Sequence, residues 1–237
     1  DAREALREIT GETHREIEVL QAEIPLVGPE PTDQAQWVET ALEQNPALLA
    51  AMAVTEAARN EVEVQRSGHY PSLDLTADYS YRDNRFGGFQ DLKRNDSAVG
   101  LELNLPLYQG GLVSSKTRQS RHRFSEAQED QERQRRATER QTRDTYRGVV
   151  TGISRVKALA QAVISNETAL EAAETGLEVG TRTTVDVLDA QRELLRARRD
   201  YARARYDYLL DTLRLKQAAG ILDETDLEAV NALLEET

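Results

Sequence analysis

The sequence predicts a mainly α-helical fold that carries one β-hairpin. Three observations support this fold class. Long proline-free stretches of helix-forming residues fill the second half of the chain, two segments near the middle alternate apolar and polar residues as strands do, and a seven-residue apolar repeat runs along the last long helix. The prediction is therefore long antiparallel coiled-coil helices joined to two strands.

Composition excludes several functional classes. The 237 residues include 30 basic and 42 acidic side chains, a formal net charge of -12. Because phosphate binding needs a basic surface, we expect no nucleic-acid partner. The chain has no cysteine, which excludes disulfides, thiolate metal sites and cysteine nucleophiles. Its longest apolar run, 47–54, is far shorter than the roughly 20 residues of a membrane-spanning helix.

Residues 1–31 are expected to be the end of a preceding helix and a linker between repeats. The first residues lack the basic and apolar regions of an export signal peptide, and 1–9 have the composition of a helix that ends near Gly11. We therefore expect the chain to be a piece of a longer protein. The linker contains four breakers, Pro25, Gly28, Pro29 and Pro31.

Residues 32–70 are expected to form two helices that lead to the strands. Thr32–Asp33 offers N-caps for the first helix. Asn45–Pro46 interrupts it, and proline is well tolerated in the first turn of the second helix. Gly68 ends that second helix.

Residues 71–108 are expected to form the hairpin. Apolar and polar residues alternate over 71–81 and again over 99–107, and the polar stretch 82–95 between them is predicted to be an exposed loop. The alternation makes one face apolar and the other polar. The apolar positions are Leu73, Leu75, Ala77, Tyr79, Tyr81, Val99, Leu101, Leu103, Leu105 and Leu107.

A two-stranded hairpin is only marginally stable in water by itself. No further strand is evident in the sequence, so other chains or other repeats have to complete the sheet. An oligomeric transmembrane β-barrel would meet this need, because lipid covers the apolar face and closure pairs every strand edge. A soluble sheet on one core would give the same alternation, and the lack of further strands counts against it.

Residues 109–220 are expected to form a long helical hairpin with its tip at 176–183. No proline occurs from Leu112 to Thr175, a helix of about 95 Å at 1.5 Å per residue. The stretch 114–148 has few large apolar side chains, so this helix has to be exposed to water on two sides.

The return helix, expected from about 183 to 219, carries the seven-residue repeat. Such a repeat is typical of close-set helices, either in the wall of a tunnel or in an ordinary two-helix coiled coil. Gly220 ends this helix, and a short final helix is expected within 221–237. The rows of the repeat are Val187, Leu194, Tyr201, Tyr208 and Leu215; Leu188, Leu195, Ala202 and Leu209; and Ala190, Ala197 and Ala204.

Segments along nearly the whole chain resemble the second structural repeat of TolC-like outer-membrane efflux and secretion channels. Residues 68–77 (GHYPSLDLTA) resemble the entry to the first strand, and 103–111 (LNLPLYQGG) the return from strand to helix. Residues 179–183 (VGTRT) and 185–190 (VDVLDA) resemble the periplasmic tip, and 204–209 (ARYDYL) the final helix. The first of the family's two repeats is absent from this sequence.

The resemblance implies an α-helical tunnel below the barrel and passive export of drugs or secreted polypeptides. It implies no enzyme chemistry and no cofactor. Expected partners are further copies of the protein (a trimer for the full-length family), outer-membrane lipid, a periplasmic adaptor and an inner-membrane transporter. The expected location is the outer membrane with a periplasmic extension. The alternative is a soluble coiled-coil interaction module such as a periplasmic adaptor, although adaptors usually have strand-rich domains.

Candidate gate residues lie at the start of the return helix. By resemblance, Arg182 ties neighbouring helix pairs shut, and Asp186 and Asp189 line the entrance as carboxylate rings that favour cations. Two local interpretations compete with this role. Thr183 and Asp186 have the spacing of a capping box, and Asp189 has Arg192 within reach on the same helix.

The turn before these residues is a candidate docking site. By resemblance, Val179, Gly180 and Thr181 contact the helical hairpin of the adaptor. A turn alone would explain Gly180 but not an apolar Val179 at an exposed tip. The family's tyrosine that partners the gate arginine is replaced by Leu177, which is a departure from the family's gate.

Tyrosines near the strand ends are candidates for an aromatic belt at the membrane interface, with ordinary core tyrosines as the alternative. They are Tyr79, Tyr81 and Tyr108. No catalytic or metal-binding motif is evident, since the only histidines, His14, His69 and His122, are scattered.

Overall fold

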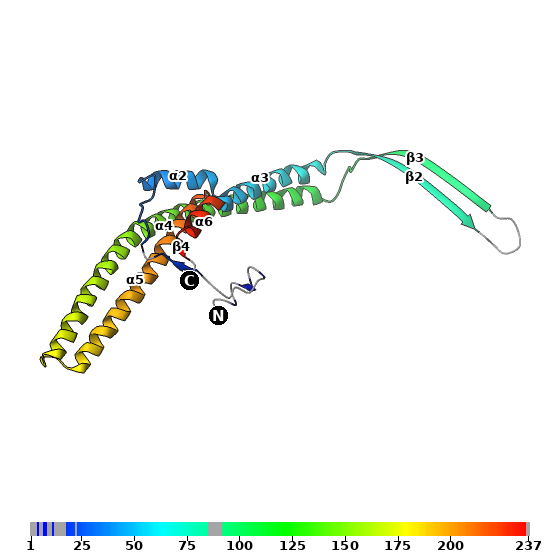
Figure 1. Ribbon diagram of the computed structural model, residues 1–237. Coiled ribbons are helices and arrows are strands. Elements are labelled where there is room, and N and C mark those ends of the chain that lie inside the picture. Colours follow the sequence, from blue (N-terminus) through cyan, green and yellow to red (C-terminus); the bar gives the residue numbers. More distant parts are fainter. Residues whose placement is uncertain are drawn as a thin grey trace. The chain divides into compact units, whose positions relative to one another are not determined.

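The computed structural model describes residues 4, 7, 8, 11, 18–21, 23–84 and 92–235 (Figure 1). The mainly helical fold with one long hairpin is confirmed. None of the described helices is both long and apolar enough to cross a membrane. The elements are β1 (Val19–Leu20), α2 (Gln34–Gln44), α3 (Pro46–Ser67), β2 (Ser72–Asn84), β3 (Leu92–Asn104), α4 (Leu112–Glu178), α5 (Thr184–Ala219), α6 (Glu224–Asn231) and β4 (Leu234–Glu235).

The chain divides into two compact units. The first unit contains residues 1–49 and 133–237, and the second contains residues 50–132. Most of the helix expected over 1–9 and the centre of the loop between the strands, 85–91, lie outside the described residues.

The core of the first unit lies between α4, α5, α2 and the segment that precedes α2. The Tyr208 hydroxyl accepts a hydrogen bond from the Val27 N–H and donates one to the Val27 carbonyl oxygen, both at 2.9 Å. Trp37 Nε1 donates to the Pro31 carbonyl oxygen at 2.8 Å. Hydrogen bonds therefore hold the predicted linker against the helices. The buried core cluster is Trp37, Val149, Val156, Ala204, Tyr208, Leu215 and Ala219.

The repeat on α5 has one closed row and one row that is open only in its half near the α4–α5 turn, because its last residue, Leu209, packs against the core. In the first row Leu194 and Leu215 are buried, as the pattern predicts for a seam with α4. In the neighbouring row Leu188 is 54% exposed and Leu195 is 61% exposed. Near the turn, the single chain thus covers only one side of the predicted coiled-coil surface.

The ends of α2 and α5 meet at Gly220. This residue ends α5 with φ +78°, and its N–H donates to the Gln217 carbonyl oxygen at 3.1 Å. The backbone of Gln44 lies so close that a Cβ on Gly220 would be 2.3 Å from the Gln44 carbonyl oxygen. Asn45 adds a polar link, because its Nδ2 donates to the Ala218 carbonyl oxygen at 2.9 Å.

In the second unit α3 lies along the beginning of α4 (Figure 1). Thr55 Oγ1 donates to the Ala127 carbonyl oxygen at 3.1 Å. Just after the C-terminal end of α3, a Cβ on Gly68 would be 3.2 Å from Val113. The predicted end of the second helix before Gly68 is confirmed.

The antiparallel register of β2 and β3 aligns the predicted apolar positions. Leu75 lies opposite Leu101, and its neighbours on the same face pair in the same way. Both strands continue into the predicted loop, to Asn84 and from Leu92, because backbone pairing does not require an apolar side chain. The second strand ends at Asn104 rather than 107, next to Pro106, which has no N–H for a ladder.

A second, very short sheet was not predicted. Val19–Leu20 pairs antiparallel with Leu234–Glu235. The expectation of only two strands was therefore wrong, and the end of the chain is partly extended where a final helix was expected. Two residues are too few to produce a recognisable alternation, so this pairing depends on the approach of distant segments.

Candidate functional site

The turn between α4 and α5 has a well-defined helix-ending geometry. Gly180 has φ +76°, and its N–H donates to the Leu177 carbonyl oxygen at 3.0 Å, while the Thr181 N–H donates to that of Gly176 at 2.8 Å. This pair of bonds is a Schellman motif, which requires a left-handed residue at the position of Gly180. The helix was expected to break from Gly176, but it continues to Glu178.

Gly176 has a role that the sequence did not predict. Its carbonyl oxygen also accepts hydrogen bonds from the Arg182 N–H and from Thr181 Oγ1, both at 3.0 Å. A Cβ on Gly176 would be 2.5 Å from Cγ of Arg182. The absent side chain therefore lets the Arg182 stem lie against the end of α4. A second glycine four residues before Gly180 was the only sign of this contact.

A capping box fixes the start of α5. Thr183 Oγ1 accepts a hydrogen bond from the Asp186 N–H at 3.3 Å, and the Thr183 N–H and hydroxyl both donate to Asp186 Oδ2 at 2.8 Å. The bond from the Thr183 N–H, then that from its hydroxyl, hold the pKa of Asp186 below its ordinary value, and the charge of Arg182 adds to this. The local capping role of Asp186 is thus confirmed.

The other candidate carboxylate is paired within its own helix. Asp189 Oδ1 lies 3.0 Å from Arg192 Nη1, and both side chains are more than half exposed. The structure therefore brings Arg182, Thr183 and Asp186 together and leaves Asp189 further along α5. A lumen-facing role for either carboxylate stays a prediction.

Apolar side chains are exposed at the tip. Val179 is 69% exposed, Val185 65% and Leu188 54%. Leu177, which is expected to replace the family's gate tyrosine, is 38% exposed. The tip thus presents a small apolar surface beside an ionised carboxylate.

Replacing Thr183 by valine is expected to raise the pKa of Asp186 part of the way to its ordinary value. The hydroxyl donor is lost, while the stronger contribution of the Thr183 N–H remains. Because the folded-state pKa is lowered, the ionised cap stabilises α5 above the ordinary carboxyl pKa, and this stabilisation disappears as the pH falls through the folded-state value. Carboxyl-carbon NMR titration measures the shift. Thr184→Val is the control, and an unchanged pKa in Thr183→Val would contradict the assignment.

One face of the hairpin is apolar on both strands from the Leu73–Leu103 pair to the Ala77–Val99 pair. Beyond that point the apolar side chains are Tyr79 and Tyr81 of β2, which lie opposite polar residues of β3. On β2 this face extends from Leu73 to Tyr81, about 26 Å at 3.3 Å per residue. At the 35–45° strand tilt of outer-membrane barrels this is a height of roughly 20 Å, most of their roughly 25 Å apolar band. On the opposite face, Asp74 lies across from Glu102. The exposed fractions on the apolar face are Leu73 67%, Leu75 72%, Tyr79 73%, Tyr81 54%, Val99 78%, Leu101 73% and Leu103 68%.

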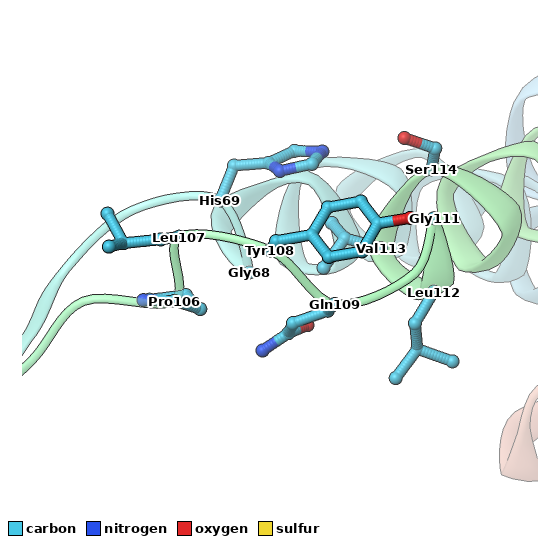
Figure 2. A pocket seen from close by; sticks show the side chains of 10 residues that line it. All are labelled: Gly68, His69, Pro106, Leu107, Tyr108, Gln109, Gly111, Leu112, Val113 and Ser114. Carbon is cyan, nitrogen blue, oxygen red and sulfur yellow. The ribbon is translucent and has the colours of Figure 1, made fainter.

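The three candidate tyrosines are all exposed, so none is a core residue of this chain. Tyr79 and Tyr81 lie within β2, before its end at Asn84. Tyr108, 88% exposed, lies beyond β3 in the connection to α4. There it lines a cleft of about 200 Å³ together with His69 and Val113 (Figure 2).

Within the described ranges, no group of three or more histidine, aspartate or glutamate side chains could hold a metal ion. The charged residues of the turn instead form local caps and pairs.

Comparison with protein families finds a match over most of the chain. The family described as outer membrane efflux protein matches residues 37–221. The outer membrane protein TolC of Vibrio cholerae serotype O1 is 39% identical over 232 residues, which cover 97% of this chain and 53% of that protein. The alkaline protease secretion protein AprF of Pseudomonas aeruginosa is 32% identical over 202 residues, which cover 85% of this chain and 42% of AprF.

A solved structure has the same fold. The open state of the MtrE outer membrane channel of Neisseria gonorrhoeae superposes with a TM-score of 0.69 at 19% identity, covering 93% of this chain and 50% of MtrE. At this identity the similarity establishes the fold alone. The chain spans about half the length of the curated relatives it matches.

Proposed function

This chain belongs to the outer membrane efflux protein family, and on that premise we propose that the protein containing it forms an outer-membrane export channel. The observation that carries the proposal is the hairpin, whose apolar face is exposed along its length while the other face is polar. Lipid outside and water inside a barrel would satisfy both faces. A trimer of full-length chains, each with two repeats, would supply the remaining strands.

The helices would form a tunnel that continues from the barrel into the periplasm. The open row on α5, with Leu188 and Leu195 exposed, provides a surface for the neighbouring helix pair, as coiled-coil packing requires. Drugs or secreted polypeptides would pass through this duct without chemical change. The name of the AprF relative, a protease secretion protein, supports polypeptides as one class of cargo.

The α4–α5 turn would be the periplasmic end of the duct. We infer that Val179, Gly180 and Thr181 contact a periplasmic adaptor that connects the channel to an inner-membrane transporter. An exposed apolar residue at a rigid, capped turn supports this contact. Arg182, which lies back against Gly176, would tie neighbouring helix pairs in the closed state.

Asp186 and Asp189 are expected to create a cation-selective entrance. Changing both to asparagine should weaken block by a multivalent cation by at least about tenfold, because a carboxylate attracts a nearby unit charge by roughly 1 kcal/mol even in water. The measurement is conductance of the protein containing this chain in a planar bilayer, with the blocker added on the helical side.

Asp200→Asn is the matched control, because Asp200 is also paired with an arginine on α5, Arg199, but lies further from the tip. Asparagine preserves a side-chain acceptor for the capping box at Asp186. Unchanged block in the double variant would reject the carboxylate ring. Failure of the wild-type protein to conduct would reject the channel itself.

A further inference from the structure

The beginning of α4 is strongly basic, although the chain as a whole is acidic. Residues 112–125 contain no aspartate or glutamate, although the whole chain has a net charge of -12. The four basic residues of this stretch are Lys116, Arg118, Arg121 and Arg123. Such a local reversal of charge indicates an anionic neighbour.

Part of this basic stretch forms one wall of a cleft. The cleft has a volume of about 400 Å³, and the end of α3 forms the opposite wall. Its lining has cations and hydroxyl groups but no carboxylate. The lining residues are Arg66, His69, Ser114, Thr117, Arg118 and Arg121.

The guanidinium groups of the cleft are available to a ligand. Arg118 and Arg121 are exposed and have no ion pair among the described residues. Arg66 has a carboxylate neighbour, Glu63, at 3.8 Å, and its side chain is 58% exposed. Guanidinium groups bind phosphate oxygens through paired, directional hydrogen bonds.

The cleft adjoins the apolar surface of the hairpin base. His69 lines both this cleft and the smaller cleft that contains Leu107 and Tyr108 (Figure 2). Leu107 is 89% exposed and Leu112, at the start of α4, is 50% exposed. A ligand in the cleft would therefore have apolar side chains on the side of the strands and arginines on the side of the helices.

We propose that this cleft binds the phosphate group of an anionic phospholipid, in the leaflet that faces the helices. The inference rests on the proposed barrel, which places the hairpin in lipid. Arg118 and Arg121 lie about 9 and 14 Å along α4 from its first residue at 1.5 Å per residue, and long arginine side chains extend toward an interface. The nearby leucines favour a lipid over free phosphate, because they offer contacts to its acyl chains.

The test uses the protein containing this chain, reconstituted in phosphatidylethanolamine bilayers with a minor fraction of spin-labelled phosphatidylglycerol. Electron paramagnetic resonance gives the association constant of the labelled lipid relative to phosphatidylethanolamine. Arg118→Gln with Arg121→Gln should lower this preference about thirty-fold, corresponding to about 1 kcal/mol for each cation.

The matched control is Arg140→Gln with Arg155→Gln, which removes the same charge from exposed positions further along α4. It should leave the lipid preference unchanged. An equal loss in both double variants, or no loss in Arg118→Gln with Arg121→Gln, overturns the site. Competition by dissolved inorganic phosphate that abolishes the preference would identify a free-phosphate site and also overturns the lipid proposal.

Conductance of the same preparations separates this inference from the proposed function. If the channel conducts normally and the arginine substitutions leave its lipid preference unchanged, only the lipid site is refuted. If the wild-type protein neither inserts nor conducts, both the barrel and the lipid site are refuted.

Discussion

Replacing Gly220 by alanine is expected to lower the free energy of unfolding by about 2–5 kcal/mol. Gly220 has φ +78°, a left-handed conformation that costs a residue with a Cβ about 1–2 kcal/mol. The new Cβ would also be 2.3 Å from the Gln44 carbonyl oxygen and 2.9 Å from the Asn45 nitrogen. These are backbone atoms, so relief requires α2 to move from the end of α5, at a further cost of about 1–3 kcal/mol.

Gly180→Ala provides the control for the steric part of this effect. Gly180 has nearly the same φ, +76°, but no atom lies within 4 Å of the position that its Cβ would occupy. The Gly180→Ala variant should therefore lose only the free energy that the left-handed conformation costs, about 1–2 kcal/mol. Thermal unfolding followed by circular dichroism compares the two variants. Equal losses would show that the contact with Gln44 contributes nothing.

The Gly220 contact also explains how the N-terminal segment is attached. Asn45 caps α3 by accepting hydrogen bonds from the Ala47 and Leu48 N–H groups at 3.0 and 3.1 Å. The same side chain donates to the end of α5 at Ala218. Loss of the close approach at Gly220 should thus disturb the Asn45 cap of α3 as well as the packing of α2 on the end of α5.

Replacing Leu75 by arginine is expected to prevent most of the protein from inserting into bilayers. Leu75 lies on the apolar face opposite Leu101 and is 72% exposed in the chain. An arginine on the lipid face near the middle of a barrel costs about 2–4 kcal/mol in each chain, a factor of roughly 30 to 1,000. The measurement is the folded, vesicle-bound fraction after dilution from denaturant.

Thr76→Arg is the matched control, because Thr76 is the next residue and its side chain lies on the opposite, polar face. The same charge at nearly the same depth should leave insertion close to that of the wild type if this face lines a wet interior. Equal effects at Leu75 and Thr76 would contradict the assignment of lipid to one face only. Normal insertion of the Leu75→Arg variant would contradict the barrel.

Several helix caps were predicted at the level of single residues, because the sequence within one turn indicates them. Asp33 caps α2 by accepting from the Ala35 N–H at 2.9 Å, and Gly220 ends α5. The spacing of Thr183 and Asp186 also indicated a capping box, which the structure contains. In each case the groups that interact are a few residues apart, so the backbone geometry of one turn determines the contact.

The sequence by itself determined the helices, the hairpin and the apolar face of the strands, because periods of 3.6 and 2 residues specify which side chains share a face. The tertiary structure alone decided which row of α5 is buried, how Arg182 lies on Gly176, and that β1 pairs with β4. These features depend on distances between segments remote in the chain or on the path of a turn. Periodicity contains no information about such distances, and packing sets them.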